Sequence, residues 1–299
     1  MEHTRTISLA FDVGSRVDLR LENRSGPVSI RGEEVRQVRV EVVARLWAES
    51  DAEADEQAQE IVRGMLHEGN RVTIRAPTLA WPGPFLFGRG PRIEYRVSLP
   101  RTSVANVTSR SGRIEVEDLA GPVQVEAHSG SVNLRRIGAS AAVTSHSGSV
   151  QAEAIGGSLT IDSRSGGVQV RRCGGDLTVH SRSGSLRIEE VSGSLKAECR
   201  SGSFAIAGVG GGLTVRARSG SLRYEGPVRG PFDIEARSGS IVLAVDRESR
   251  FFLDAETAHG SIRSDLPVRR GPPGRTASGE TGHRVRIRTR SGSIRITQS

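Results

Sequence analysis

The sequence predicts an all-β fold: a single-stranded parallel β-solenoid (β-helix) of 18-residue two-strand coils, with a small α+β cap on its N-terminal side. A Ser-Gly dipeptide recurs in steps of 18 residues from Ser111-Gly112 to Ser219-Gly220, a fixed period that is typical of stacked repeats. Within each repeat, apolar residues alternate in two short runs nine residues apart, as expected for two strands. Aromatic residues make up only 4% of the chain and 36 residues are glycine, which suits narrow coils packed with small side chains.

Residues 33–101 interrupt the repeat and predict an inserted β-α-β cap. An extended segment leads to Ser50 and Glu53, a capping box that indicates the start of a helix. Gly69 is expected just past the end of this helix. One face of the helix is expected to carry the apolar residues Ala54, Ala58, Ile61 and Met65.

Two strands are expected after the helix, at residues 71–75 and 92–99. The Pro/Gly-rich loop between them holds Trp81, Phe85 and Phe87. A cap of this kind covers the edge strand of the solenoid, which would otherwise recruit other chains.

The repeat that starts at Gly175 shows how one coil is expected to fold. Its two strands meet at the Ser183-Gly184 corner, where glycine permits a positive φ angle. Stacked coils about 4.8 Å apart pair their strands in parallel and share one core. Inward positions are expected for Leu177, Val179, Leu186, Ile188 and Val191, and outward positions for Thr178, His180, Arg187 and Glu189.

The repeats give four expected segments. Residues 1–101 hold the first coil and the cap, residues 102–268 the solenoid, residues 269–283 a loop, and residues 284–299 a final coil. The corner motif continues with slight slippage at Ser238-Gly239, His259-Gly260 and Ser291-Gly292. The final strand has no following cap in the sequence, so its edge is expected to be open to another solenoid.

Charge and cysteine content bound the partners and the compartment. The formal net charge is +8, from 42 basic and 34 acidic residues. Residues 1–101 hold 15 of each, so the remainder carries the whole excess of positive charge.

Cys173 and Cys199 fall in different columns of the repeat, and no disulfide is expected. No secretion signal or membrane-spanning segment is recognised, so a cytoplasmic location is expected, with peripheral association with the cell envelope left open.

The sharpest candidate site is the column of residues directly before the Ser-Gly corner. Stacking brings five consecutive arginines into one row, where neighbouring charges repel and an anionic polymer would relieve the repulsion. The alternative is a solvated surface on which these arginines pair with nearby acids such as Asp162, Glu198 and Glu235. The candidate anion-binding residues are Arg164, Arg182, Arg200, Arg218 and Arg237.

Other patterns point away from catalysis and from a cofactor. The corner serines repeat, whereas a catalytic serine needs one base at one place, so they predict a hydroxyl ladder at a turn. His128 and His146 are too few to hold a metal. Sequence-specific nucleic-acid binding is not expected, because no aromatic platform alternates with the arginines. No catalytic residue, metal site or cofactor is therefore expected.

The chain resembles the bacterial putative-adhesin β-strand-repeat family, a domain family of unknown function. The resemblance lies in the segments 24–30, 97–100, 258–268 and 288–296, and in the helix with Ala54 and Ala58. It implies the repeat fold and suggests surface adhesion. Many relatives carry Asp after the Ser-Gly corner, whereas this chain has serine there, as at Ser185 and Ser203.

Three functional hypotheses follow. The first is a non-catalytic binding or surface-interaction scaffold, whose partner is a polyanion, an anionic component of the envelope or another protein. The second is a self-assembling structural protein. The third and weaker one is a β-helix acyltransferase, which the nine-residue half-repeat disfavours because those enzymes need an aliphatic residue every six positions.

Overall fold

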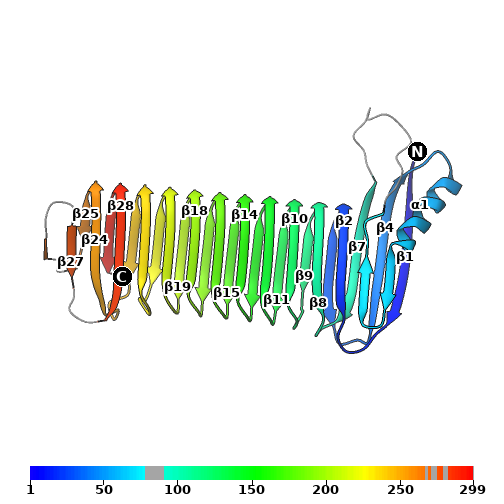
Figure 1. Cartoon of the computed structure of the whole chain (residues 1–299), viewed down its shortest axis with the longest axis horizontal. Helices are drawn as coiled ribbons and strands as arrows, with labels where there is room; N and C mark the ends of the chain where they lie inside the picture. The colour runs from blue at the N-terminus through cyan, green and yellow to red at the C-terminus, as the bar shows by residue number, and fades with distance from the viewer. Residues whose placement is uncertain (78–90, 267–268, 271–274, 279–281, 299) are drawn as a thin grey trace. The chain divides into compact units, whose positions relative to one another are not determined.

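The computed structural model describes residues 1–77, 91–266, 269–270, 275–278 and 282–298 (Figure 1). The chain divides into two compact units, Met1–His146 and Ser147–Ser299. Nearly all of the described elements are strands, and most pair in parallel. The expected all-β architecture with long parallel sheets is confirmed, and it is consistent with a β-solenoid. The predicted loop with Trp81, Phe85 and Phe87 lies outside the described residues.

The first unit places its strands in two sheets. One has the order β1 (Glu2–Asp12), β4 (Gln37–Trp47), β7 (Arg92–Pro100), β3 (Val28–Glu33), β9 (Ile114–Glu117) and β11 (Val132–Ile137). The other has the order β12 (Ala141–Ser147), β10 (Val123–Ser129), β8 (Val104–Ser111), β2 (Asp18–Ser25), β6 (Arg71–Ile74) and β5 (Met65–Glu68).

The second unit also contributes to two sheets. One has the order β13 (Val150–Ile155), β15 (Val168–Cys173), β17 (Leu186–Val191), β19 (Phe204–Val209), β21 (Leu222–Gly226), β23 (Ile241–Val245), β29 (Ile294–Gln298) and β25 (Ile262–Ser264). The other has the order β14 (Leu159–Ser165), β16 (Leu177–Ser183), β18 (Leu195–Ser201), β20 (Leu213–Ser219), β22 (Phe232–Ser238), β28 (His283–Ser291), β24 (Phe251–His259), β27 (Arg275–Ser278) and β26 (Arg269–Arg270).

The core forms from like residues in register. Leu177 lies opposite Leu159 on one side and Leu195 on the other, and Leu186 lies opposite Val168 and Phe204. The inward assignment is confirmed by burial, because the exposed fraction is at most 1% for Leu177, Val179, Leu186, Ile188 and Val191. The expected outward residues are all at least partly exposed.

The Ser-Gly corner requires glycine for two reasons. Gly184 has a φ of +136°, a conformation that side chains rarely adopt. A Cβ atom built on Gly184 would also lie 2.0 Å from the carbonyl oxygen of Gly166. The expectation from φ alone therefore captured only half of the constraint.

The helix α1 (Asp51–Arg63) begins as predicted and ends earlier. The Ser50 hydroxyl accepts a hydrogen bond from the Glu53 amide at 3.2 Å, and the Glu53 carboxylate accepts one from the Glu49 amide at 2.7 Å. The expected end near Gly69 is wrong, because Gly64 caps the helix and its carbonyl accepts from the Arg75 amide. Met65 is buried as the first residue of β5 rather than on the helix face.

The inserted strands cover the edge of the first repeat. β7 pairs in parallel with β3, β4 pairs antiparallel with β7, and β1 pairs antiparallel with β4. In the other sheet, β6 pairs with β2, and β5 forms a hairpin with β6 through Gly69, which has a φ of +58°.

The expectation of an open edge at the last strand is wrong. β29 lies between β23 and β25, and β28 lies between β22 and β24, all in parallel. The final strands are therefore inserted between two earlier pairs of strands. The repeat pattern could not reveal this order, because the apolar alternation is the same in all three pairs.

Candidate functional site

The five predicted arginines all precede a Ser-Gly corner in the second unit. They occupy equivalent places near the ends of β14, β16, β18, β20 and β22, and all are exposed. The register continues through the corner, since Ser183 lies opposite Ser165 and Ser201. Neighbouring parallel strands lie about 4.8 Å apart, so the arginines form a row with that step.

The corner serines anchor the backbone of this row. The Ser183 hydroxyl donates to the Arg164 carbonyl at 3.4 Å, and Ser219 and Ser238 donate in the same way to Arg200 and Arg218. The serines therefore tie one strand pair to the next through the carbonyl of the arginine, rather than acting as a ladder of mutually bonded hydroxyls. These hydrogen bonds hold the backbone of each arginine at an equivalent position in successive strands.

Among the described residues, no ion pair or side-chain hydrogen bond engages any of the five guanidinium groups. Two of the acids considered as partners are used elsewhere. Glu198 binds Lys196 at 3.2 Å and His180 at 3.4 Å, and the hydrogen bond from Lys196 is the main cause of the lowered pKa of Glu198. Glu235 lies 3.9 Å from Arg216.

The other sheet of the second unit has a different electrostatic character. Glu189 accepts from Arg187 at 2.7 Å and from Arg171 at 3.1 Å. The hydrogen bond from Arg187 is the main cause that lowers the pKa of Glu189. Arg172 pairs with Glu153, and Arg223 pairs with Glu225 at 3.5 Å. These four arginines are therefore each paired with a neighbouring acid.

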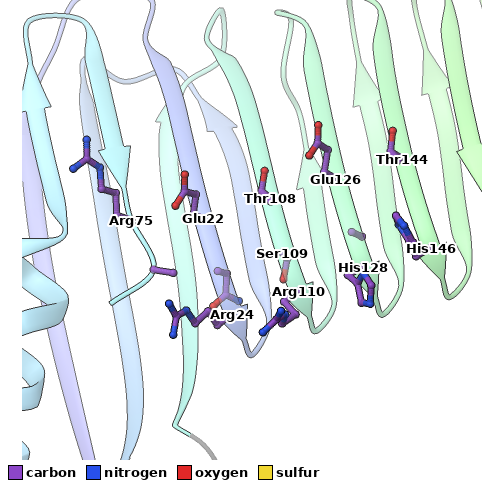
Figure 2. A pocket seen from close by; sticks show the side chains of 13 residues that line it. Glu22, Arg24, Arg75, Thr108, Ser109, Arg110, Glu126, His128, Thr144 and His146 are labelled. Carbon is purple, nitrogen blue, oxygen red and sulfur yellow. The ribbon is translucent and has the colours of Figure 1, made fainter. Parts of the chain in front are cut away.

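A surface hollow of about 650 Å³ lies in the first unit, over the outer face of β2, β8, β10 and β12. Figure 2 shows two rows of side chains that cross these strands. One row is made of Arg24, Arg110, His128 and His146, and the other of Glu22, Thr108, Glu126 and Thr144. Arg75 lies to one side.

The column before the Ser-Gly corner already included Arg110, His128 and His146, whereas Arg24 and the whole second row were not predicted. Each residue of the second row stands two positions before one of the first, and residues two apart in a strand share a face. That spacing was the available signal for the second row. The rings of His128 and His146 are stacked, with centroids 4.9 Å apart and an angle of 29° between their planes.

The side chains that line the hollow combine cationic, acidic and hydroxyl groups. Guanidinium and imidazole groups suit an anionic group, and the neighbouring carboxylates and hydroxyls suit hydrogen-bond donors. Within the described part of the chain, no cluster of three or more His, Cys, Asp or Glu side chains could hold a metal ion.

The two cysteines are buried and unlinked. Burial is the main cause that raises the pKa of the Cys173 thiol, which disfavours the reactive thiolate. Of the helices in the described ranges, none is both long and apolar enough to cross a membrane.

Comparisons with known proteins identify a family. Two solved structures cover nearly the whole chain at 11% identity. One, described as a putative cell adhesion protein from Clostridium sporogenes, covers 99% of this chain and 100% of its own, with a TM-score of 0.33. The other, described as a putative adhesin from Bacteroides fragilis, covers 98% and 97%, with a TM-score of 0.30. Among curated proteins, none matches. A family model matches residues 17–297, which is most of the chain, and the protein therefore belongs to the Toastrack DUF4097 family.

Proposed function

We propose that this protein is a non-catalytic surface-interaction scaffold that binds a linear anionic polymer along the row of Arg164, Arg182, Arg200, Arg218 and Arg237. The observation that carries the proposal is that these five exposed guanidinium groups have no acidic partner among the described residues. In the same unit, the arginines Arg171, Arg172, Arg187 and Arg223 all have one.

The proposed repeating unit is a closed 18-residue coil of two strands. Like residues lie opposite each other in both sheets, and the serine hydroxyls reach the carbonyl of a residue 19 or 20 positions earlier. We also propose the division into residues 1–101, 102–268, 269–283 and 284–299. A closed coil places one arginine at every step of the stack, which makes the row regular.

The charge spacing favours an anionic polymer over a small anion. Two like charges about 4.8 Å apart repel each other by roughly 1 kcal/mol in water. A polymer that carries several negative groups relieves this repulsion at every step and releases its counterions as it binds. Arginine also offers a planar fork that pairs with phosphate, sulfate or carboxylate oxygens.

The test compares two variants of equal net charge. One changes Arg164, Arg182, Arg200 and Arg218 to Gln, and the control changes the acid-paired Arg171, Arg172, Arg187 and Arg223 to Gln. Each variant lowers the formal net charge from +8 to +4. Surface ion pairs contribute little to stability, so both variants should fold.

Binding to polyphosphate is measured by titration calorimetry at low and moderate salt, with vesicles that contain an anionic lipid as a second probe. We expect the row variant to lose binding and the control to keep most of it. We also expect wild-type affinity to fall as salt increases. Equal binding by the two variants would mean that binding depends on net charge alone and not on the row, which contradicts the proposal. The proposal would also be refuted if the wild-type protein bound neither polyphosphate nor the anionic vesicles.

A further inference from the structure

The strand β1 exposes one long unpaired edge. Its eleven residues pair with β4 in an unbroken antiparallel register, from Glu2 opposite Trp47 to Asp12 opposite Gln37. No described strand pairs with its other side. Other outermost strands are much shorter, with four residues in β5, three in β25 and two in β26. Short edge strands avoid unwanted pairing, whereas a long regular edge is a template for another strand.

The alternation of hydrogen-bonded and non-bonded residues along β1 shows which backbone groups point toward the unpaired edge. The Met1 carbonyl accepts from the Ala48 amide at 3.1 Å, and the Val13 amide donates to the Arg36 carbonyl at 3.0 Å. In an antiparallel ladder, directly opposed residues alternate between bonded and non-bonded pairs. Odd-numbered residues of β1 therefore bond to β4, and even-numbered residues point their backbone groups outward.

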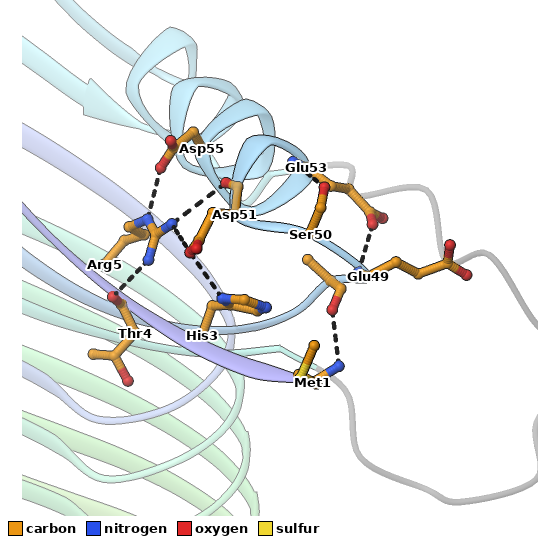
Figure 3. Close-up of polar contacts among 10 residues, drawn as sticks. Met1, His3, Thr4, Arg5, Glu49, Ser50, Asp51, Glu53 and Asp55 are labelled. Carbon is orange, nitrogen blue, oxygen red and sulfur yellow. Dashed lines mark hydrogen bonds and ion pairs between the residues drawn. The ribbon is translucent and has the colours of Figure 1, made fainter.

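The helix α1 limits the available part of this edge. Figure 3 shows Arg5 held between Asp51 and Asp55, each at 2.7 Å. The same guanidinium donates to the Thr4 carbonyl at 3.3 Å. Beyond Thr4, the outward backbone groups belong to Thr6, Ser8, Ala10 and Asp12, and Asp12 lies opposite the engaged Thr4 when two copies pair about Ser8.

We propose that a second copy of this chain docks antiparallel on β1, with a two-fold axis at Ser8. The outward backbone groups of Thr6, Ser8 and Ala10 are symmetric about Ser8. In the dimer, Ser8 pairs with Ser8 of the other copy, and Thr6 pairs with Ala10. A two-fold axis perpendicular to the sheet makes the same patch serve on both copies.

The side chains of β1 fit this register. On the half-buried face, Ile7 lies opposite Leu9 of the other copy, so the axis is flanked by apolar contacts on both sides. Asp12 lies opposite Thr4 and does not meet Glu2, which avoids a pair of like charges. A second copy is the proposed occupant because, in this register, the apolar Ile7 and Leu9 face each other and no like charges are opposed.

Disulfide crosslinking tests the register directly. In a Ser8→Cys variant, the two introduced thiols lie on opposite sides of the axis as cross-strand neighbours. In the matched Thr4→Cys variant, on the same exposed face, the two thiols lie eight residues apart along the strands, about 27 Å. The native Cys173 and Cys199 are buried, which keeps the background low. We expect covalent dimers under mild oxidation for Ser8→Cys and not for Thr4→Cys; crosslinking by both variants or by neither would overturn the register.

Sedimentation velocity tests the backbone contact. The wild-type protein and Ser8→Ala should shift from monomer to dimer as concentration rises. Ser8→Pro removes the outward amide at a place where an edge strand tolerates proline, and should raise the dissociation constant at least about tenfold. A wild-type monomer at every concentration, or a proline variant that dimerises like Ser8→Ala, would contradict the proposal. If the proline variant fails to fold, the crosslinking of Ser8→Cys and Thr4→Cys still tests the proposed dimer. The variant with Arg164, Arg182, Arg200 and Arg218 changed to Gln should dimerise like the wild type. A failure of the dimer proposal can therefore be told apart from a failure of the proposed polymer binding.

Discussion

The second unit turns its chain at two kinds of bend, and both use a positive φ angle. At the Ser-Gly corner, Gly166, Gly184 and Gly220 have φ values of +122°, +136° and +135°. At the second bend, near the ends of β13, β15 and β17 in the other sheet, Ala154, Arg172 and Glu190 have φ values of +57°, +58° and +59°. The second range is the left-handed helical region, which side chains enter at a modest cost. A repeated glycine is therefore needed only where the angle lies outside that region and the neighbouring backbone is too close.

The strand between the two bends is the first place to break this arrangement. Changing Leu195 to Asp buries a charge without a partner, since Leu195 is only 1% exposed. We expect a loss of about 4 kcal/mol or more in the free energy of unfolding. Urea denaturation followed by circular dichroism measures the effect. An unchanged unfolding midpoint would contradict the inward position of this residue.

A pair of alanine substitutions tests the difference between the bends. Gly184→Ala should cost roughly 2–4 kcal/mol, because it adds both strain and a backbone clash. Gly208→Ala at the second bend should stay within about 1 kcal/mol of wild type. Gly208 has a φ of +65°, and the nearest atom to an added Cβ is 3.7 Å away.

The same urea experiment compares the two alanine variants. Equal losses of stability would mean that the bends do not differ in their need for glycine. A small effect at both positions would mean that the corner can relax around a Cβ atom.

The smallest effect is expected at Glu189, beside the second bend. The hydrogen bond from Arg187 lowers the pKa of this carboxyl group in the folded state. Its contribution to stability is therefore present above the unfolded pKa and is lost as the pH falls through the folded pKa. Arg187→Gln should shift the pKa of Glu189 upward toward the ordinary value, as measured by NMR titration. The unfolding midpoints of wild type and variant should then converge at acid pH. An unshifted pKa would show that Arg171 alone holds the carboxylate.

The sequence predicted features that repeat more completely than features that occur once. The corner glycines and the buried Leu177 and Leu186 could be predicted because each repeat needs a positive φ angle at the corner and an apolar residue in the core. The end of α1 was misjudged because Met65 fits both the helical apolar spacing and a strand. β1 was missed, although Ile7, Leu9 and Phe11 alternate as in a strand.

The candidate sites were also predicted only in part. The row of arginines could be predicted because stacking aligns equivalent residues. Whether each arginine had an acidic partner could not, because that depends on side-chain directions such as those of Glu198 toward Lys196 and His180. The second row of the hollow was missed because only the column next to the corner was followed.

The insertion of β28 and β29 sets an order on how the chain can fold. β22 and β24 follow each other along the chain within one sheet, with β23 of the other sheet between them, but each pairs with β28. During synthesis, β24 lacks this partner until residues 283–291 have left the ribosome, and closing the intervening segment carries an entropic cost. Earlier strands add to a neighbour that already exists, in the manner of a growing stack. The last part of the second unit therefore assembles late and all at once, and its strand edges stay exposed to other chains until then.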